Sequence, residues 1–186
     1  KRLEFLKGIS AQLEKMQWMI TTLLKISKFD AGTAVLHKEP VELAAVVEQA
    51  LAPFIIQAEL RQMTLAVDCR QGQFLGDRLW TVEAVQNIVK NCLEHMDNGG
   101  TLRLTGTQTA LYCQLVIADD GCGIEKEDLP HIFERFYKGK NAGPDSVGIG
   151  LALSKSVLNR ENATVEVQST VGVGTTFTIR FYRNII

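Results

Sequence analysis

The fold of this chain is decided by the stretch Val116-Ile117-Ala118-Asp119-Asp120-Gly121-Cys122-Gly123-Ile124. An apolar run ends on a carboxylate and passes directly into a Gly-x-Gly turn, which predicts a β-strand that delivers Asp119 into a tight loop. Glycine lets the backbone come close to a flat ligand and take positive φ. A carboxylate at that point can accept a hydrogen bond from an exocyclic amine. Many strand-to-loop turns share this pattern, so alone it does not specify a site.

A helix with a polar stripe comes before this strand. The segment 78–96 is predicted to be helical, with Asp77 as its N-cap and Asn98-Gly99-Gly100 as its end. Its apolar positions are interrupted by four polar residues spaced four apart: Glu83, Asn87, Asn91 and His95. Asparagine prefers caps and turns, so two in one stripe need a reason. Their carboxamide oxygens can coordinate a hard cation such as Mg²⁺, which often reaches protein through substrate phosphates. The alternative is that the stripe faces solvent.

A second glycine pattern, Ser146-Val147-Gly148-Ile149-Gly150-Leu151, opens a helix predicted over 149–159. Backbone N–H groups at a helix N-terminus suit phosphate oxygens, and glycine removes the side chains that would block them. The pattern is neither a Walker A loop nor a full GxGxxG after a strand, so alone it does not specify a nucleotide site.

The remaining pattern predicts an α+β fold. Alternating residues indicate antiparallel strands at 101–105 and 111–117, and again at 164–169 and 175–181. The other expected elements are an extended segment at 37–41, a helix at 41–61 with Pro53 as a candidate kink, a strand at 65–67 and a short helix at 127–132. This order, with mostly antiparallel neighbours, favours helices on one face of a sheet, which is a two-layer α/β sandwich.

The first 29 residues predict a long helix with an apolar seam, which precedes that domain. The seam residues alternate three and four apart: Leu6, Ile9, Leu13, Met16, Ile20 and Leu23. Such a seam needs a partner helix, and the extra apolar residues Trp18, Met19 and Leu24 favour a helical bundle. The alternative is a helix packed against its own domain. Asp30-Ala31-Gly32 is predicted to end it.

Composition excludes several classes of protein. The chain has 186 residues, of which 46% are hydrophobic and 22% charged, which fits a packed chain and not a disordered one. The net charge of -1 gives no global reason to expect a nucleic-acid partner. No apolar run approaches the roughly 20 residues that cross a bilayer. The four cysteines form no CxxC pair, so free thiols in a reducing compartment are expected.

The order of the three features resembles a known family. An Asn-x-x-x-Asn helix, then Asp-x-Gly-x-Gly after a strand, then Gly-x-Gly-Leu opening a helix is similar to the catalytic ATP-binding domain of sensor histidine kinases, within the wider superfamily of gyrase-type ATPases. The segment 129–138 resembles that family's phenylalanine box, and Gly174-Thr175-Thr176-Phe177 its closing Gly-Thr strand. The likeness covers about residues 41–181. The helix ending Lys25-Ile26-Ser27-Lys28-Phe29-Asp30 resembles the second helix of the dimerisation and phosphotransfer domain.

The resemblance implies an ATP site with Mg²⁺. Asn91, with Asn87 beside it, would hold Mg²⁺ against the ATP phosphates. Asp119 would accept from the adenine amino group, helped through water by Thr175. Gly121 and Gly123 would shape the floor of the adenine pocket, with Ile124 against the base. The backbone amides of 148–151 would donate hydrogen bonds to the phosphates, and Arg135 or Lys138 would supply positive charge there. The full implied ATP-binding set is Asn87, Asn91, His95, Asp119, Gly121, Gly123, Ile124, Arg135, Tyr137, Lys138, Gly148, Ile149, Gly150, Leu151 and Thr175.

The sequence departs from the family pattern after Asn91. Glu94 stands where a phosphate-contacting lysine is common, and His95 where an aromatic residue often lies near the base. A carboxylate beside phosphates repels them unless it points away or meets a cation, so modest ATP affinity is expected. The segment from about Gly139 to Val147, which contains Gly143-Pro144, is expected to be a mobile lid.

The implied organisation is a remnant of a dimerisation and phosphotransfer helix at 1–31, a linker at 32–40 and the catalytic ATP-binding domain at 41–186. None of the three histidines, His37, His95 and His131, follows the phosphoacceptor pattern, so this piece is expected to lack its own acceptor. The intact protein would be membrane-anchored through preceding regions, with this part in the cytoplasm. Its partners would be ATP, a response regulator receiver domain and a second copy joined through the dimerisation helices, with no nucleic acid.

Three functions are compatible with these residues. The leading interpretation is a kinase that transfers the γ-phosphoryl of MgATP to a histidine, for relay to a response regulator. The alternative is a degenerate nucleotide-binding or dimerisation module without transfer activity, which Glu94 favours. A gyrase-like hydrolase would need a glutamate on the Asn helix that activates water, and Glu83, one turn before Asn87, is the candidate.

Overall fold

The computed structural model describes residues 2–139 and 146–183. Its helices are α1 (Arg2–Asp30), α2 (Leu43–Leu51), the 3-10 helix η1 (Ala52–Phe54), α3 (Ile55–Leu60), α4 (Arg78–Glu94) and α5 (Gly150–Arg160). Its strands are β1 (Glu39–Glu42), β2 (Thr64–Asp68), β3 (Gln73–Gly76), β4 (Thr101–Gln108), β5 (Tyr112–Asp119), β6 (Ala163–Thr170) and β7 (Gly174–Tyr182).

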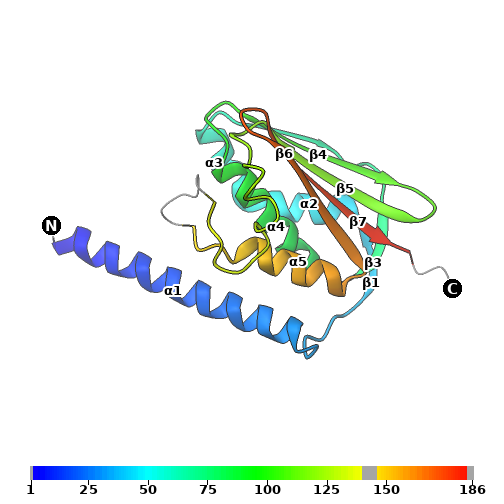
Figure 1. Cartoon of the computed structure of the whole chain (residues 1–186), viewed down its shortest axis with the longest axis horizontal. Helices are drawn as coiled ribbons and strands as arrows, with labels where there is room; N and C mark the ends of the chain where they lie inside the picture. The colour runs from blue at the N-terminus through cyan, green and yellow to red at the C-terminus, as the bar shows by residue number, and fades with distance from the viewer. Residues whose placement is uncertain (1, 140–145, 184–186) are drawn as a thin grey trace.

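A five-stranded sheet in the order β2-β4-β5-β7-β6 forms one layer, and α2, α4 and α5 form the layer beside it (Figure 1). β2 runs parallel to β4, and every other neighbouring pair in this sheet is antiparallel. A separate two-stranded sheet pairs β1 with β3. The two layers confirm the predicted α+β fold class.

The core lies between the sheet and the helices. Side chains alternate between the faces of a strand, so every second residue of the central strands is buried toward the helices. These residues are Leu102, Leu104, Cys113, Leu115, Ile117, Phe177, Ile179 and Phe181. The apolar face of α4, with Val85, Ile88 and Val89, belongs to the same core. Burying that face holds α4 against the sheet and leaves its polar stripe on the other side.

The cysteines are free thiols, as predicted, and three of the four lie in the interior. Burial raises the pKa of Cys69 and Cys113 to about 11. These two thiols are therefore protonated near neutral pH and serve as small apolar side chains.

The structure differs from the sequence-based expectation at one predicted helix and at one strand that was not predicted. The short helix expected at 127–132 is wrong: residues 126–133 form consecutive turns. Pro130 has no amide hydrogen to donate. The bonds around it mostly span three residues, as from the His131 amide to the Asp128 carbonyl at 2.9 Å, so no α-helical ladder propagates. Sequence reasoning also missed β3, which is four residues long and pairs with β1 more than 30 positions away.

The C-terminal half of α1 packs beside α5, which extends along the same side of the molecule (Figure 1). Ile26 and Phe29 are buried, and the ring of Phe29 meets Trp80 of α4 edge to face with centroids 4.8 Å apart. The seam residues nearer the N-terminus are exposed: Leu6, Ile9, Leu13, Met16 and Ile20. The C-terminal end of α1 thus packs on its own domain. The remaining seam residues are exposed and form the apolar surface for which a partner helix is expected.

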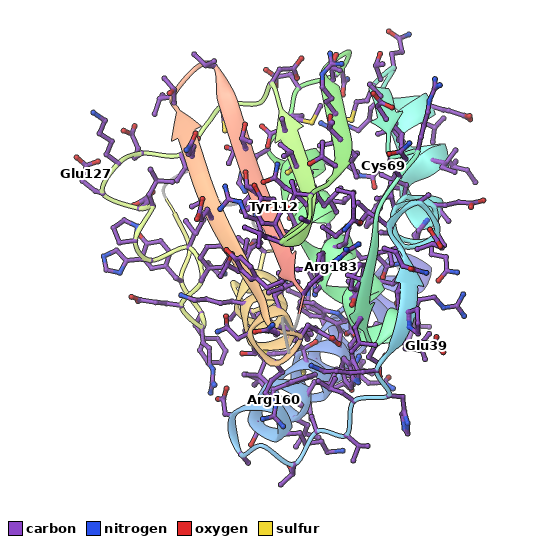
Figure 2. The ribbon with its side chains drawn as sticks, turned by 90° about the vertical axis from the view of Figure 1, so that its right-hand side faces the viewer. Glu39, Cys69, Tyr112, Glu127, Arg160 and Arg183 are labelled. Carbon is purple, nitrogen blue, oxygen red and sulfur yellow. The ribbon has the colours of Figure 1, made fainter. Side chains whose placement is uncertain are left out.

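The linker after α1 crosses to β1 along one end of the fold. The Lys38 amine donates to the carbonyl of Arg160, the last residue of α5, at 3.0 Å. Figure 2 labels Arg160 and Glu39, both toward the bottom of that view. The chain between α1 and the sheet is therefore held against the C-terminal end of α5.

The segment Leu43–Leu60 has the length and mean hydropathy of a membrane-spanning helix, and it alone does so in the part of the chain that the structure describes. It is not one helix, because η1 interrupts it at Pro53, which confirms the predicted kink. On α2 the residues Leu43, Val46, Val47 and Ala50 are fully buried. The hydropathy of α2 is therefore that of a core helix, whereas Ile55, Ile56 and Leu60 of α3 are exposed.

Candidate functional site

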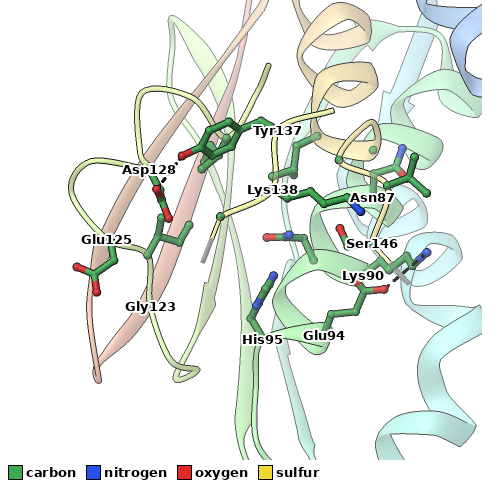
Figure 3. A pocket seen from close by; sticks show the side chains of 18 of the residues that line it. Asn87, Lys90, Glu94, His95, Gly123, Glu125, Asp128, Tyr137, Lys138 and Ser146 are labelled. Carbon is green, nitrogen blue, oxygen red and sulfur yellow. Dashed lines mark hydrogen bonds and ion pairs between the residues drawn. The ribbon is translucent and has the colours of Figure 1, made fainter. Parts of the chain in front are cut away.

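One pocket gathers most of the residues that the sequence singles out. It lies between α4, the turn after β5, the loop before residue 140 and the start of α5 (Figure 3). Its lining residues are Trp18, Asn87, Lys90, Asn91, Glu94, His95, Gly123, Ile124, Glu125, Asp128, Ile132, Tyr137, Lys138, Gly139, Ser146, Val147, Gly148, Gly150 and Leu151.

The polar stripe of α4 forms one wall of this pocket. The helix begins where the Asp77 carboxylate accepts from the amides of Leu79 and Trp80, at 3.1 and 3.2 Å, which confirms the predicted N-cap. Three stripe residues, Asn87, Asn91 and His95, line the pocket. Glu83 does not, because its carboxylate lies 2.5 Å from the Lys25 amine on α1.

The Gly-x-Gly turn after β5 is packed against the end of α4. The Cys122 amide donates to the His95 carbonyl at 3.0 Å. A Cβ on Gly121 would lie 2.4 Å from that same carbonyl oxygen, and one on Gly123 would lie 2.3 Å from the Thr170 carbonyl oxygen. Both positions are too close for any side chain, so glycine here brings the backbone and Ile124 to the pocket wall.

Asp119 is held behind this turn and is not among the lining residues. Its Oδ1 accepts from the amides of Gly121 at 2.9 Å and Thr175 at 3.2 Å. Burial raises the pKa of Asp119, while these two bonds, a bond with the Cys92 thiol and nearby His95 act in the opposite direction. The carboxylate therefore has fixed partners in the protein and is 9% exposed.

The start of α5 forms the opposite wall. Its N-cap is Ile149, and no side chain caps the first turn, in contrast to Asp77 on α4. Gly148 has a φ of +73°, and a Cβ there would lie 2.3 Å from the Tyr137 carbonyl oxygen. A helix start without a side-chain cap, beside a pocket, presents amide hydrogens and the positive end of the helix dipole to an anion.

The loop before residue 140 closes the third side. The Tyr137 hydroxyl donates to Asp128 at 2.7 Å, and this bond raises the pKa of Tyr137. Figure 3 shows Lys138 extending into the pocket from this loop and His95 entering it from the end of α4. Arg135 lies elsewhere, in an ion pair with Asp30 at the end of α1. Most of the expected lid, residues 140–145, lies outside the described residues.

Among the described residues of the lining, acidic groups outnumber basic ones. The cations are Lys90 and Lys138, and the carboxylates are Glu94, Glu125 and Asp128. Glu94 lies 3.7 Å from the Lys90 amine, so the carboxylate that departs from the family pattern has a cation beside it. In the part of the chain that is described, no cluster of three His, Cys, Asp or Glu side chains could hold a metal ion by itself.

The structure brings together ten of the predicted ATP-binding residues. Those lining the pocket are Asn87, Asn91, His95, Gly123, Ile124, Tyr137, Lys138, Gly148, Gly150 and Leu151. Five others do not line it: Asp119, Gly121, Arg135, Ile149 and Thr175. Sequence reasoning missed Lys90, Glu125 and Asp128, although Lys90 directly precedes Asn91. Nothing in the sequence pattern indicated that Trp18, on a helix expected to face a partner, lines the same pocket.

Comparison with known proteins gives consistent matches. Residues 76–185 match the family of histidine kinase-, DNA gyrase B- and HSP90-like ATPases. The chain is 26% identical over 179 residues to the sensor-like histidine kinase SenX3 of Mycolicibacterium smegmatis, covering 94% of this chain and 47% of that protein. It is 31% identical over 175 residues to the histidine-protein kinase/phosphatase MprB of Mycolicibacterium vanbaalenii, covering 92% and 35%.

A solved structure shares the arrangement over almost the whole chain. The histidine kinase AdeS of Acinetobacter baumannii superposes with a TM-score of 0.82 at 22% identity, covering 96% of this chain and 84% of that one. The long helix α1 and the α+β domain therefore occur together in another protein of this fold. This chain spans less than half the length of the curated relatives it matches.

Proposed function

Because this chain belongs to the histidine kinase-, DNA gyrase B- and HSP90-like ATPase family, we propose that it is the ATP-binding catalytic part of a sensor histidine kinase, which transfers the γ-phosphoryl of MgATP to a histidine on a phosphotransfer domain. The observation that carries the proposal is the pocket in which the Asn stripe of α4 faces the uncapped start of α5. An asparagine pair and a row of amides on opposite walls suit a ligand that is both metal-bound and anionic.

ATP would enter with its base toward the turn after β5. Ile124 offers an apolar surface, His95 a ring at the edge and Asp119 an acceptor for the adenine amine. That carboxylate would have to reach the base from behind the turn, because its Oδ1 is already bonded to the amides of Gly121 and Thr175. The phosphates would lie against the amides of 148–151, with Lys138 supplying positive charge.

The charges of the pocket support a divalent cation. With more carboxylates than lysines in the lining, a polyphosphate on its own would be repelled. Asn91 and Asn87 are neutral oxygen donors, and the absence of an acidic triad in the described residues fits a cation that arrives with the phosphates. Asn91 and Asn87 would hold Mg²⁺, which, when bound, neutralises charge on the transferring phosphoryl group.

The residues of this chain would act by positioning. Tyr137 and Asp128 hold the loop that carries Lys138, and Gly148 keeps the start of α5 free of side chains. The attacking histidine would come from a phosphotransfer domain that α1 continues, and a response regulator receiver domain would take the phosphoryl group next. We also propose that α1 pairs with a second copy through its exposed seam, and that the intact protein is membrane-anchored with this part in the cytoplasm.

Two titrations and one transfer assay test the proposal. Calorimetry should show ADP binding that strengthens with Mg²⁺, and Asn91→Ala should lower affinity only in the presence of the metal. Equal loss with and without Mg²⁺ would remove Asn91 from the metal site. A separately added phosphotransfer domain should then become labelled from γ-³²P-ATP.

Nucleotide binding without labelling would instead favour the degenerate module. The sequence feature that favours the degenerate module is Glu94. The contact of Glu94 with Lys90 weakens this alternative, because a neighbouring cation offsets the charge of the carboxylate.

A further inference from the structure

Trp18 of α1 reaches the pocket from outside the ATP-binding fold. It lines the pocket together with Lys90 of α4, and the Lys90 amine lies 5.2 Å from the centre of the Trp18 ring. This is a cation–π contact. The helix α1 thus contributes to the site at a point about three turns before its buried anchor at Phe29.

Lys90 is placed to serve a second ligand. Its side chain is half exposed, and it lies in the same pocket wall as the Asn stripe. Its contact with Glu94 spans one helical turn at 3.7 Å and holds the amine near the pocket (Figure 3). Lys138, the second lysine among the described lining residues, comes from the loop on the facing side.

We propose that the Lys90 amine is shared between two alternative partners, the Trp18 ring of α1 and the phosphates of a bound nucleotide, so that docking of this part of α1 and nucleotide binding oppose each other. The proposal rests on the proposed nucleotide site. A charge-assisted contact to phosphate is stronger than a cation–π contact at a half-exposed position. When nucleotide is bound, the Lys90 amine would therefore contact the phosphates and not the Trp18 ring. By reciprocity, the nucleotide would weaken the α1 contact by the same factor.

A double-mutant cycle with Trp18→Ala, Lys90→Met and the combined variant tests this, with MgADP affinity measured by calorimetry. Lys90→Met should weaken binding about tenfold, the effect of one charge-assisted contact. Trp18→Ala should tighten binding about two- to fivefold, and it should do so only while Lys90 is present. Lys90→Arg should restore most of the affinity. Lys126→Met, an exposed lysine outside the pocket, is the matched control and should change nothing.

Other outcomes separate the possible failures. If Trp18→Ala weakens binding equally in both backgrounds, Trp18 is a wall of the nucleotide site and the competition is wrong. If Trp18→Ala has no effect while the unaltered chain binds MgADP, the competition is wrong and the nucleotide site stands. If the unaltered chain does not bind MgADP, both proposals fail. Circular dichroism checks that each variant keeps its helix content.

Discussion

The Glu83 carboxylate lies 2.5 Å from the Lys25 amine and joins α4 to α1. Glu83 is therefore directed to the helix and not to the pocket, although it belongs to the same stripe as Asn87. A general base for hydrolysis must reach the attacking water by a hydrogen bond. This contact counts against the gyrase-like hydrolase, for which Glu83 was the candidate base.

Glu83→Gln should therefore leave ATP turnover measured without an acceptor domain unchanged within about twofold. It should lower the free energy of unfolding by about 0.5 kcal/mol, since the pair is partly exposed. Phosphate release and urea denaturation measure the two effects, with Glu59→Gln on α3 as the control. A tenfold fall in ATP turnover would instead support the hydrolase interpretation, with Glu83 as the general base.

Asp119→Asn should remove ADP binding with little loss of stability. The asparagine side chain keeps an oxygen that accepts from the amides of Gly121 and Thr175. Its second oxygen is replaced by an NH2 group, which cannot accept a hydrogen bond from the adenine amine. We expect affinity to fall at least tenfold, about 1.4 kcal/mol. Asp119→Ala should also cost about 1–3 kcal/mol of stability, because it leaves those amides unpaired.

Calorimetry and urea denaturation separate the two contributions of Asp119. Asp120→Asn is the matched control, since Asp120 accepts from the Thr101 amide and does not line the pocket. Retained ADP affinity in Asp119→Asn would mean that the adenine contact is assigned to the wrong residue.

Gly123→Ala should destabilise the fold by about 2 kcal/mol or more. Gly123 has a φ of +74°, and a Cβ would meet the Thr170 carbonyl oxygen at 2.3 Å, so the variant adds a clash to the backbone strain. Gly99→Ala is the comparison, because its φ is +82° but its Cβ would meet nothing within 4 Å. It should cost only about 1 kcal/mol. Similar losses in both would show that the turn can move away from β6.

Glu161→Gln should stabilise the protein increasingly as the pH rises. Glu161 is 1% exposed; its Oε1 accepts from the Asp77 amide at 3.0 Å, and its Oε2 has no hydrogen-bond partner in the described residues. Burial raises its pKa, so the folded state holds the proton more tightly than the unfolded state does. Its contribution is therefore present below the unfolded pKa and declines as the pH passes through the folded one.

The glutamine keeps an acceptor for Asp77 without the buried charge. The stability difference between Glu161→Gln and the parent should grow to about 1 kcal/mol between pH 4.5 and 7.5, as measured by urea denaturation across that range. A difference independent of pH would mean that Glu161 titrates alike in both states.

The sequence predicted those parts of the fold and site that depend on local pattern. Strand alternation placed Leu102, Leu115 and Phe177 in one core, and helical spacing placed Asn87 and Asn91 on one face. It failed where partners lie far apart along the chain. β3 has four residues and is defined by its pairing with β1, so periodicity could not reveal it.

The same reason explains the errors at the site. Arg135 was expected at the phosphates, but its ion pair joins it to Asp30, 105 positions earlier. Trp18 and Lys90 meet across a distance of 72 positions, and no local rule connects them. Residue type thus predicted the chemistry of the pocket, while the docking of α1 decided which side chains face it.

The buried anchor of α1 at Ile26 and Phe29 has a mechanical consequence. The helix continues without interruption from residue 2 to residue 30, and most of its exposed seam, from Leu6 to Met16, lies on the N-terminal side of Trp18. A helix is stiff over such a length of about 40 Å, so twisting its far end about the long axis would carry the indole past the lysine. A rotation imposed at the N-terminal end of α1 would therefore change the Trp18–Lys90 contact at the nucleotide pocket, without movement of any other element.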